Sequence, residues 1–214
     1  EHDAVYSSEL TTLEYGVFVY CSALTSITLP RKVTSIVNAF VESSLTEVIL
    51  NQDRIGTGNG FPNGMGYNQT IGGKSGVNII GYKILNGTGT LTSTGSFASS
   101  IVVIEDYNRI GASAFSSSTR TKFVIGKSVT SIGTNAFSNS DSLTTVTFEP
   151  GSQLTTIENS AFYFCGQLTS ISIPPLVTSI GQSSFVGCYK LRTVTFEHDA
   201  VYSSELTTLE YGVF

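Results

Sequence analysis

The sequence predicts a β-rich solenoid in which short parallel strands stack coil on coil and are joined by short turns or 3-10 segments. Two stretches that begin 144 residues apart, at Leu24 and Leu168, read LTSITLPRKVTSIVNAF and LTSISIPPLVTSIGQSSF and nearly coincide. From Phe115 to Phe185, the Phe residues at the equivalent repeat position are 22, 25 and 23 residues apart. A repeat of this length is one coil that cannot bury its own apolar side, so successive coils must stack.

Each coil begins with a strand of the pattern L-x-x-I-x-I, at residues 24–29, 143–148 and 168–173. Apolar and hydroxyl-bearing residues alternate along it with period two, which is typical of a strand with one face in the core. A second extended V-T-S-I piece follows, and then an A-F turn that is too short for a helix. We expect the parallel strands of successive coils to stack at ~4.8 Å as one continuous narrow sheet.

Phe is the residue expected to fill the core. Eight of the 13 Phe occupy one repeat position, four or five residues after the Ile or Leu of V-T-S-I or at the end of the shortened versions RIGTGNGF and RIGASAF. These eight form one column: Phe18, Phe40, Phe61, Phe115, Phe137, Phe162, Phe185 and Phe214.

Residues 62–98 break the repeat and hold nine Gly. Their front half reads as loop, and the second part, VNIIGYKILNGTGTLTSTGSF, predicts a β-hairpin that turns at Asn86-Gly87. The predicted organisation is therefore repeat coils over 1–61, a Gly-rich insertion with a capping hairpin over 62–98, and repeat coils over 99–214. A ligand-binding loop is the alternative interpretation of the insertion.

The two ends of the chain carry the same text. Residues 1–18 are identical to residues 197–214, and chance does not give 18 consecutive matches. The last coil, which stops at Phe214, would continue naturally as VYCSALTSITLP, the text after Phe18. The sequence is interpreted as one period of a tandem array, or else as a single domain whose interchangeable ends allow head-to-tail pairing. Neither interpretation gives the end coils polar caps, so both predict exposed apolar surface there.

The composition favours an extracellular or cell-surface protein. Charged residues make up 13% of the chain, about half the usual ~25%, and 30 Ser and 27 Thr supply the polar surface instead. A net charge of −5 with scattered Lys and Arg argues against nucleic acid and anionic membranes as partners. No apolar run approaches the ~20 residues of a membrane span, so we expect no membrane insertion.

The cysteines follow the repeat. Cys21, Cys165 and Cys188 each lie three residues after a column Phe, a position that the repeat explains without a metal. A buried ladder of free thiols is favoured. A disulfide between stacked neighbours is the alternative, because parallel Cβ atoms about 5 Å apart lie just beyond the favoured ~3.5–4.5 Å.

No pattern predicts catalysis. His2 and His198 are the same residue of the duplicated text, so the chain has one independent histidine, which is expected to lie in a solvated loop. There is no C-x-x-C, Ser-His-Asp order, P-loop or dinucleotide fingerprint. We therefore expect no enzyme activity, no metal and no cofactor.

The candidate binding face consists of the outward hydroxyl residues of the strands: Ser26, Thr28, Thr145, Thr147, Ser170, Ser172, Thr193 and Thr195. Such columns can simply solubilise the sheet, form a flat recognition surface for a protein or glycan, or order water or bind ice. Asn68 and Asn86 begin N-glycosylation sequons, which count only if the source glycosylates secreted proteins.

The repeat is similar to a known one. LTSISIPPLVTSIGQSSFVGCYKL resembles the unit of the BspA-like leucine-rich proteins, roughly L-x-x-I-x-I-P-x-x-V-x-x-I-G-x-x-A-F-x-x-C, and the resemblance extends over residues 10–61 and 99–214. It implies a leucine-rich repeat solenoid on the cell surface or secreted, attached to host, matrix or neighbouring-cell proteins. A few departures are expected to loosen their coils: Arg120 in the Leu column, Val37 after the Ile, and Ser43, Ser118 and Ser140 in the Cys column.

The sequence thus predicts an extracellular structural or adhesive repeat protein that forms a rod or filament by head-to-tail association with itself. The alternative is a discrete surface module that binds a protein or glycan through the hydroxyl face.

Overall fold

The computed structural model describes residues 10–30, 32–51, 66–92, 99–198 and 206–214. The chain divides into two compact units, Glu1–Lys83 and Ile84–Phe214, and β6 (Lys74–Asn86) runs across this boundary. In the described ranges every regular element is a β-strand. These ranges contain no helix that could cross a membrane.

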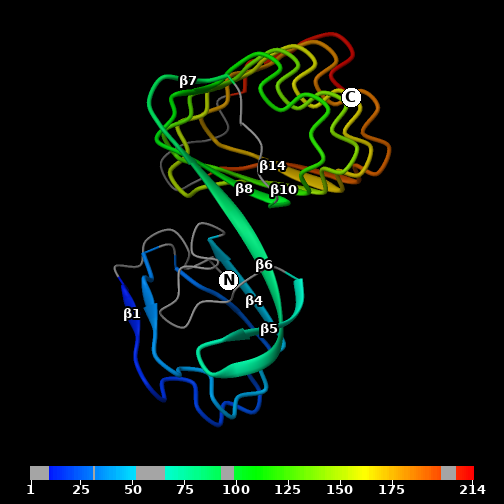
Figure 1. The fold of residues 1–214 in the computed structure, drawn as a ribbon. Helices are drawn as coiled ribbons and strands as arrows, with labels where there is room; N and C mark the ends of the chain where they lie inside the picture. The colour runs from blue at the N-terminus through cyan, green and yellow to red at the C-terminus, as the bar shows by residue number, and fades with distance from the viewer. Residues whose placement is uncertain (1–9, 31, 52–65, 93–98, 199–205) are drawn as a thin grey trace. The chain divides into compact units, whose positions relative to one another are not determined.

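The second unit is a stack of coils, and most of its coils contribute two parallel strands (Figure 1). One row of strands consists of β8 (Ile101–Glu105), β10 (Lys122–Ile125), β12 (Thr145–Phe148), β14 (Ser170–Ile173) and β16 (Thr193–Phe196). The other row is one six-stranded parallel sheet made of β7 (Thr90–Leu91), β9 (Arg109–Ile110), β11 (Ser131–Ile132), β13 (Thr156–Ile157), β15 (Ser179–Ile180) and β17 (Thr208–Leu209). This arrangement confirms the predicted solenoid.

The prediction of one continuous sheet is wrong for the first row, because β14 and β16 form a separate two-stranded sheet. In other coils the residue after the strand donates its backbone N–H to the preceding coil, as Glu149 does to Ile125 and Glu197 does to Ile173. Pro174 occupies this position after β14 and has no N–H. The proline therefore removes a rung at the point where the sheet divides.

The A-F segment of each coil forms a tight turn. Residues two before and two after the column Phe have left-handed backbones, as Asn135 (φ 56°) and Asn139 (φ 57°) do around Phe137. Asn and Gly tolerate this conformation best. The turn directs the N–H of Phe137 to the carbonyl of Ala161 in the following coil at 2.8 Å.

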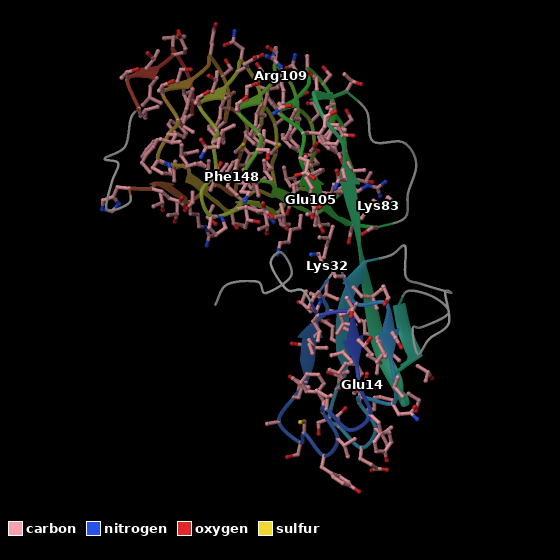
Figure 2. All side chains as sticks on the ribbon, turned by 90° about the vertical axis from the view of Figure 1, so that its left-hand side faces the viewer. Glu14, Lys32, Lys83, Glu105, Arg109 and Phe148 are labelled. Carbon is pink, nitrogen blue, oxygen red and sulfur yellow. The ribbon has the colours of Figure 1, made fainter. Side chains whose placement is uncertain are left out.

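The Phe column forms the core, as predicted. In the second unit five rings stack nearly parallel, with neighbouring centroids 5.0–5.6 Å apart: Phe115, Phe137, Phe162, Phe185 and Phe214. In the first unit Phe18 stacks on Phe40 at 5.3 Å. Figure 2 shows the side chains that fill the interior of the coils. Phe61 lies outside the described residues.

The first unit is a shorter stack of the same kind. Strand β1 (Thr12–Leu13) pairs with β3 (Ser35–Ile36), and β2 (Ser26–Thr28) pairs with β4 (Glu47–Asn51), both in parallel. β4 pairs in turn with β6, which also pairs antiparallel with β5 (Gly66–Ile71).

The hairpin of the Gly-rich insertion turns at Gly72-Gly73, where Ile71 faces Lys74, and not at Asn86-Gly87 as predicted. Both glycines have positive φ, which suits a two-residue hairpin turn. Residues 66–71, predicted as loop, form strand β5. Strand β6 continues to Asn86, and the chain beyond it enters the parallel row at β7. The domain limits 1–61, 62–98 and 99–214 remain predictions.

The hairpin turn caps the first stack. The N–H of Phe40 donates to the carbonyl of Gly72 at 3.1 Å, the bond that Phe18 makes with Ala39 of the next coil. A Cβ on Gly72 would lie 2.6 Å from Ile36 and 2.9 Å from the ring of Phe40. Gly72 therefore stands where the following coil would place its alanine.

Candidate functional site

The hydroxyl face lies where the alternation placed it. All eight predicted side chains are exposed or half-buried; of the residues between them, Val146 and Ile171 are buried and Ile27 and Val194 are half-buried. Strand pairing aligns Ser170 with Thr193 and Ser172 with Thr195. Ser26 and Thr28 belong to β2 of the first unit and are not part of this set.

The face does not extend along the whole second unit. The positions in register with Thr147 are Val124 on β10 and Val103 on β8, and both valines are buried. The position in register with Thr145 on β10 is Lys122. The hydroxyl face of the second unit is therefore limited to β12, β14 and β16, and a regular Thr array of the kind that an ice-binding surface would need is interrupted.

A second set of hydroxyl groups has a different role, which the sequence analysis missed. The Thr directly before a strand donates its hydroxyl to a carbonyl one coil earlier, over 2.9–3.3 Å. The donors are Thr34, Thr46, Thr121, Thr130, Thr144, Thr155, Thr178 and Thr207. The signal was the Thr that recurs directly before these strands, both in V-T-S-I and at Thr46, Thr121 and Thr144 before first-row strands. These hydroxyls connect coils and are not a recognition surface.

The cysteine column also connects coils. Cys165 donates its thiol to the carbonyl of Phe137, and Cys188 donates to the carbonyl of Phe162, each over 3.2 Å. Both cysteines are buried free thiols, and Cys21 is a partly exposed free thiol, which agrees with the predicted ladder. The adjacent Cys188 sulfur, together with burial, raises the pKa of the Cys165 thiol. Cys165 is therefore a protonated donor and a poor nucleophile.

The predicted loosening by serine in this column is not seen at Ser140. Ser140 is buried, and its hydroxyl donates to the carbonyl of Phe115 at 2.9 Å, the same bond that Cys165 makes one coil later. Ser43 also binds a column carbonyl, that of Phe40 in its own coil. A hydroxyl is a stronger donor than a thiol, so at Ser140 the substitution keeps the connection between coils, whereas Ser43 bonds only within its own coil.

One charged cluster lies on the second row of strands. Arg109, labelled in Figure 2, forms an ion pair with Glu158 at 2.5 Å. The other carboxylate oxygen of Glu158 accepts from the N–H and the hydroxyl of Thr134, at 2.9 and 3.0 Å. The carboxylate is thus occupied by structural donors, and the cluster ties together the coils of β9, β11 and β13.

The histidines and the two sequon asparagines are the remaining residues that the sequence analysis singled out. In the described part of the chain, no cluster of His, Cys, Asp and Glu could hold a metal ion. His198 is exposed, and His2 lies outside the described residues. Asn86 is exposed at the end of β6, and Asn68 lies on β5.

The coil that contains Phe214 has an apolar side that no other described coil covers. Phe214 is 58% exposed, and Phe196 and Leu209 are also exposed. A hollow of about 250 Å³ lies beside Phe214, lined by Phe185, Gly187, Cys188, Tyr189, Leu191, Arg192, Val194 and Phe214 itself. We call this surface the open end.

The duplicated text is seen in two environments. Residues 10–18 stack on a following coil, through β1 and β3, whereas residues 206–214 stack on a preceding coil, through β15 and β17. Leu13 is 4% exposed and its duplicate Leu209 is 51% exposed. The reverse holds for Val17, at 51%, and its duplicate Val213, at 4%. Each copy of the segment buries the residue that the other exposes.

Comparison with known sequences finds one family. A family model described as the BspA type leucine rich repeat region matches residues 3–108 and 108–214, in six copies. No curated protein matches the chain.

Three solved structures are similar. A leucine-rich repeat protein from Bacteroides capillosus is 29% identical over 51% of this chain and 86% of its own, with a TM-score of 0.45. A leucine rich cell surface protein from Faecalibacterium prausnitzii is 21% identical over 95% of this chain, with a TM-score of 0.32. The pneumococcal vaccine antigen PcpA is 17% identical over 86%, with a TM-score of 0.38. The chain spans 63% and 42% of the lengths of the last two.

Proposed function

Because the chain belongs to the BspA-type leucine-rich repeat family, we propose that it is an extracellular structural or adhesive protein that forms a rod by end-to-end stacking of its coils. It has no catalytic role in this proposal. The Ser- and Thr-rich surface and the low charge support a place outside the cell or on its surface.

The observation that carries the proposal is the open end. Within the stack each column Phe, such as Phe137 or Phe162, is fully buried between the Phe of the preceding coil and that of the following one. Phe214 contacts Phe185 on one side only and leaves its other side in solvent. Strand β16 likewise ends its sheet and presents one unpaired edge. Apolar surface next to an open strand edge favours the addition of another coil.

Solution measurements test the proposal. We expect the 214-residue chain to self-associate with increasing concentration in sedimentation velocity runs. Val194→Lys places a charge on β16 at the open end and should weaken this association at least about 10-fold, because a buried unpaired charge opposes stacking. Thr147→Lys is the control, since it adds the same charge at the exposed Thr147 of β12, away from the open end.

Two outcomes contradict the proposal. The wild-type chain could remain monomeric at all concentrations, or both lysine variants could associate like the wild type. Thermal unfolding followed by circular dichroism verifies that the variants are folded.

A second candidate function rests on the alignment of the hydroxyl face. Ser170, Ser172, Thr193 and Thr195 lie in register on neighbouring strands and offer a flat polar surface for a protein or glycan of a host, matrix or neighbouring cell. The quadruple change of Thr145, Thr147, Ser170 and Ser172 to Lys should abolish capture on arrays of matrix proteins and glycans. Unchanged capture would exclude this face.

A further inference from the structure

We infer that the second unit binds a neutral hexose oligosaccharide at a cluster of aromatic side chains. The cluster consists of Tyr163, Phe164 and Tyr189, and we call it the ring cluster. It lies in the turns that lead from the A-F segments into β14 and β16, so it is separate from the hydroxyl face on those strands. The inference goes beyond the proposed rod and does not depend on it.

The rings of the cluster contact one another. The centroids of Tyr163 and Phe164 lie 4.5 Å apart, with 50° between the ring planes. Those of Phe164 and Tyr189 lie 5.8 Å apart, and their planes are nearly perpendicular, at 85°. Tyr189 is 78% exposed, and the other two rings are half-buried. Aromatic rings gathered at one place on a surface mark a binding site, whereas scattered single rings do not.

A glycine stands opposite each ring of the central pair. A Cβ on Gly187 would lie 2.6 Å from Cδ2 of Phe164, so the absent side chain leaves room for this ring on the following coil. A Cβ on Gly166 would lie 3.6 Å from Cδ2 of Tyr189, which therefore lies against the preceding coil. The two rings thus meet in the same seam between two coils. These contacts lie within residues 160–190 and do not involve the last described coil.

Phe164 has a backbone conformation that aromatic residues rarely adopt. Its φ is 56°, and the residues at the same repeat position in the neighbouring coils are Asn139 and Gly187, which tolerate this conformation best. A bulky side chain in the left-handed region costs free energy, and such residues cluster at functional sites. The stability of the turn therefore does not explain the ring.

Polar groups of both charges lie next to Tyr189. Oδ1 of Asp141 lies 3.2 Å from the same Cβ position on Gly166, so a carboxylate and the Tyr189 ring approach this glycine from opposite coils. Lys190 donates from Nζ to Oε1 of Gln167 at 2.6 Å. All three polar side chains are exposed. The cluster thus offers a carboxylate, an amide and an ammonium group beside the rings, and the two charges cancel.

A hexose matches this combination of groups. One face of a pyranose ring consists of C–H groups, which pack on an aromatic ring, and its edge carries hydroxyl groups that both donate and accept hydrogen bonds. Binding sites for small molecules combine aromatic lining with a few polar groups that fix the orientation of the ligand. The balanced charge favours a neutral sugar over an anionic one. An apolar peptide would bury Asp141 and Lys190 without partners, which opposes its binding.

Calorimetric titration of the full chain with neutral hexaoses tests the inference. The probes are the hexaoses of β-linked glucose, α-linked glucose, mannose and N-acetylglucosamine. We expect at least one of them to bind with a dissociation constant of about 1 mM or tighter. Phe164→Asn and Tyr189→Ser should each weaken that binding at least about 10-fold. The chain itself uses Asn139 and Ser22 at these repeat positions, so neither change should prevent folding, which circular dichroism verifies.

Tyr20→Asn is the matched control. Tyr20 has the repeat position of Phe164, a φ of 58° and an exposure of 77%. The next coil places Glu42 at the position of Gly187, so no glycine makes room for the ring. This change should alter the dissociation constant by no more than about 2-fold.

Four outcomes overturn the inference. No hexaose binds the wild-type chain, even if the ring variants lower its capture on arrays of matrix proteins, which would make the cluster a protein-binding surface. A hexaose binds the ring variants as tightly as the wild type. It loses binding only when the hydroxyl face is changed to Lys, which would place the sugar there. Or Tyr20→Asn weakens binding as much as the ring variants do. Self-association is measured separately, so each of these outcomes leaves the proposed rod intact.

Discussion

The last described coils of the two stacks differ in what covers them. In the first stack the last described ring, Phe40, is fully buried because Gly72 of the hairpin bonds to its N–H and packs on its face. In the second stack the last ring, Phe214, is 58% exposed. The coils themselves are alike, with the same Phe stacking and the same parallel strands.

The difference shows that the residues of a coil do not determine what covers its far side. A coil offers the same bonding groups to whatever follows, because each Phe N–H needs an acceptor and each ring needs a cover. A hairpin with a small residue at its tip can supply both, as Gly72 does for Phe40. Without such a cap, another coil is the natural complement.

The largest expected difference is in the stability that is lost when a column Phe is replaced by Ala. Phe40→Ala should destabilise the protein by about 3–5 kcal/mol, as should Phe162→Ala in the middle of the second stack, because each leaves a buried cavity. Phe214→Ala should cost about 1 kcal/mol or less in the isolated chain, since half of the ring is already in water. Urea unfolding of the three variants measures these costs. Equal costs for Phe40 and Phe214 would contradict the comparison.

The hairpin cap can be broken at one residue. Gly72→Val should cost about 1–3 kcal/mol more than Gly76→Val, because the new side chain must enter the space of Ile36 and Phe40. Gly76 is a matched control in the same hairpin: its φ is also positive, at 74°, but nothing lies within 4 Å of its Cβ position. The difference between the two variants isolates packing from backbone strain. If they unfold at the same urea concentration, Gly72 does not cap the stack.

The polar column distinguishes the stacks further. Ser140 joins two coils of the second stack, whereas Ser43 bonds within its own coil. Ser140→Ala should cost about 1–3 kcal/mol, because the buried carbonyl of Phe115 loses its side-chain donor. Ser140→Cys restores a donor at the same position and should recover most of that loss in the same urea titration. A cysteine variant as unstable as the alanine variant would show that the bond contributes little.

Much of the fold could be predicted because the same sequence pattern occurs in many coils. A Phe column and a period-two strand recur in each coil, so an error at one coil, such as Arg120 in the Leu position, does not change the register. The break in the first row could be predicted only from Pro174. This proline lacks the backbone N–H that the equivalent residues of other coils donate to the preceding coil. The same repeat logic explains why Ser140 was misjudged: its residue type changes, but its bond does not.

The hairpin turn was predicted at the wrong residues because the insertion contains two sequences that are typical of such turns. Asn86-Gly87 and Gly72-Gly73 are both typical hairpin turns in sequence. The structure selects the second because its tip fits against Phe40, a contact that depends on tertiary position. The open end was predictable from the duplicated text. The complementary burial of Leu13 in one copy and Val213 in the other was not, because it depends on which side each copy stacks.

The smallest expected difference concerns the threonine hydroxyls. Thr155 donates to Thr130, and its own carbonyl accepts from Thr178, so it lies between two coils. Thr207 donates to Thr178 in the last coil before the open end. Thr155→Val keeps the side-chain shape and removes the hydroxyl, and it should cost about 0.5–1.5 kcal/mol. Thr207→Val should cost less in the isolated chain, because its neighbourhood is held on one side only. Measured at concentrations where the chain self-associates, the cost of Thr207→Val should rise toward that of Thr155→Val. A cost that does not change with concentration would mean that the last coil stays open.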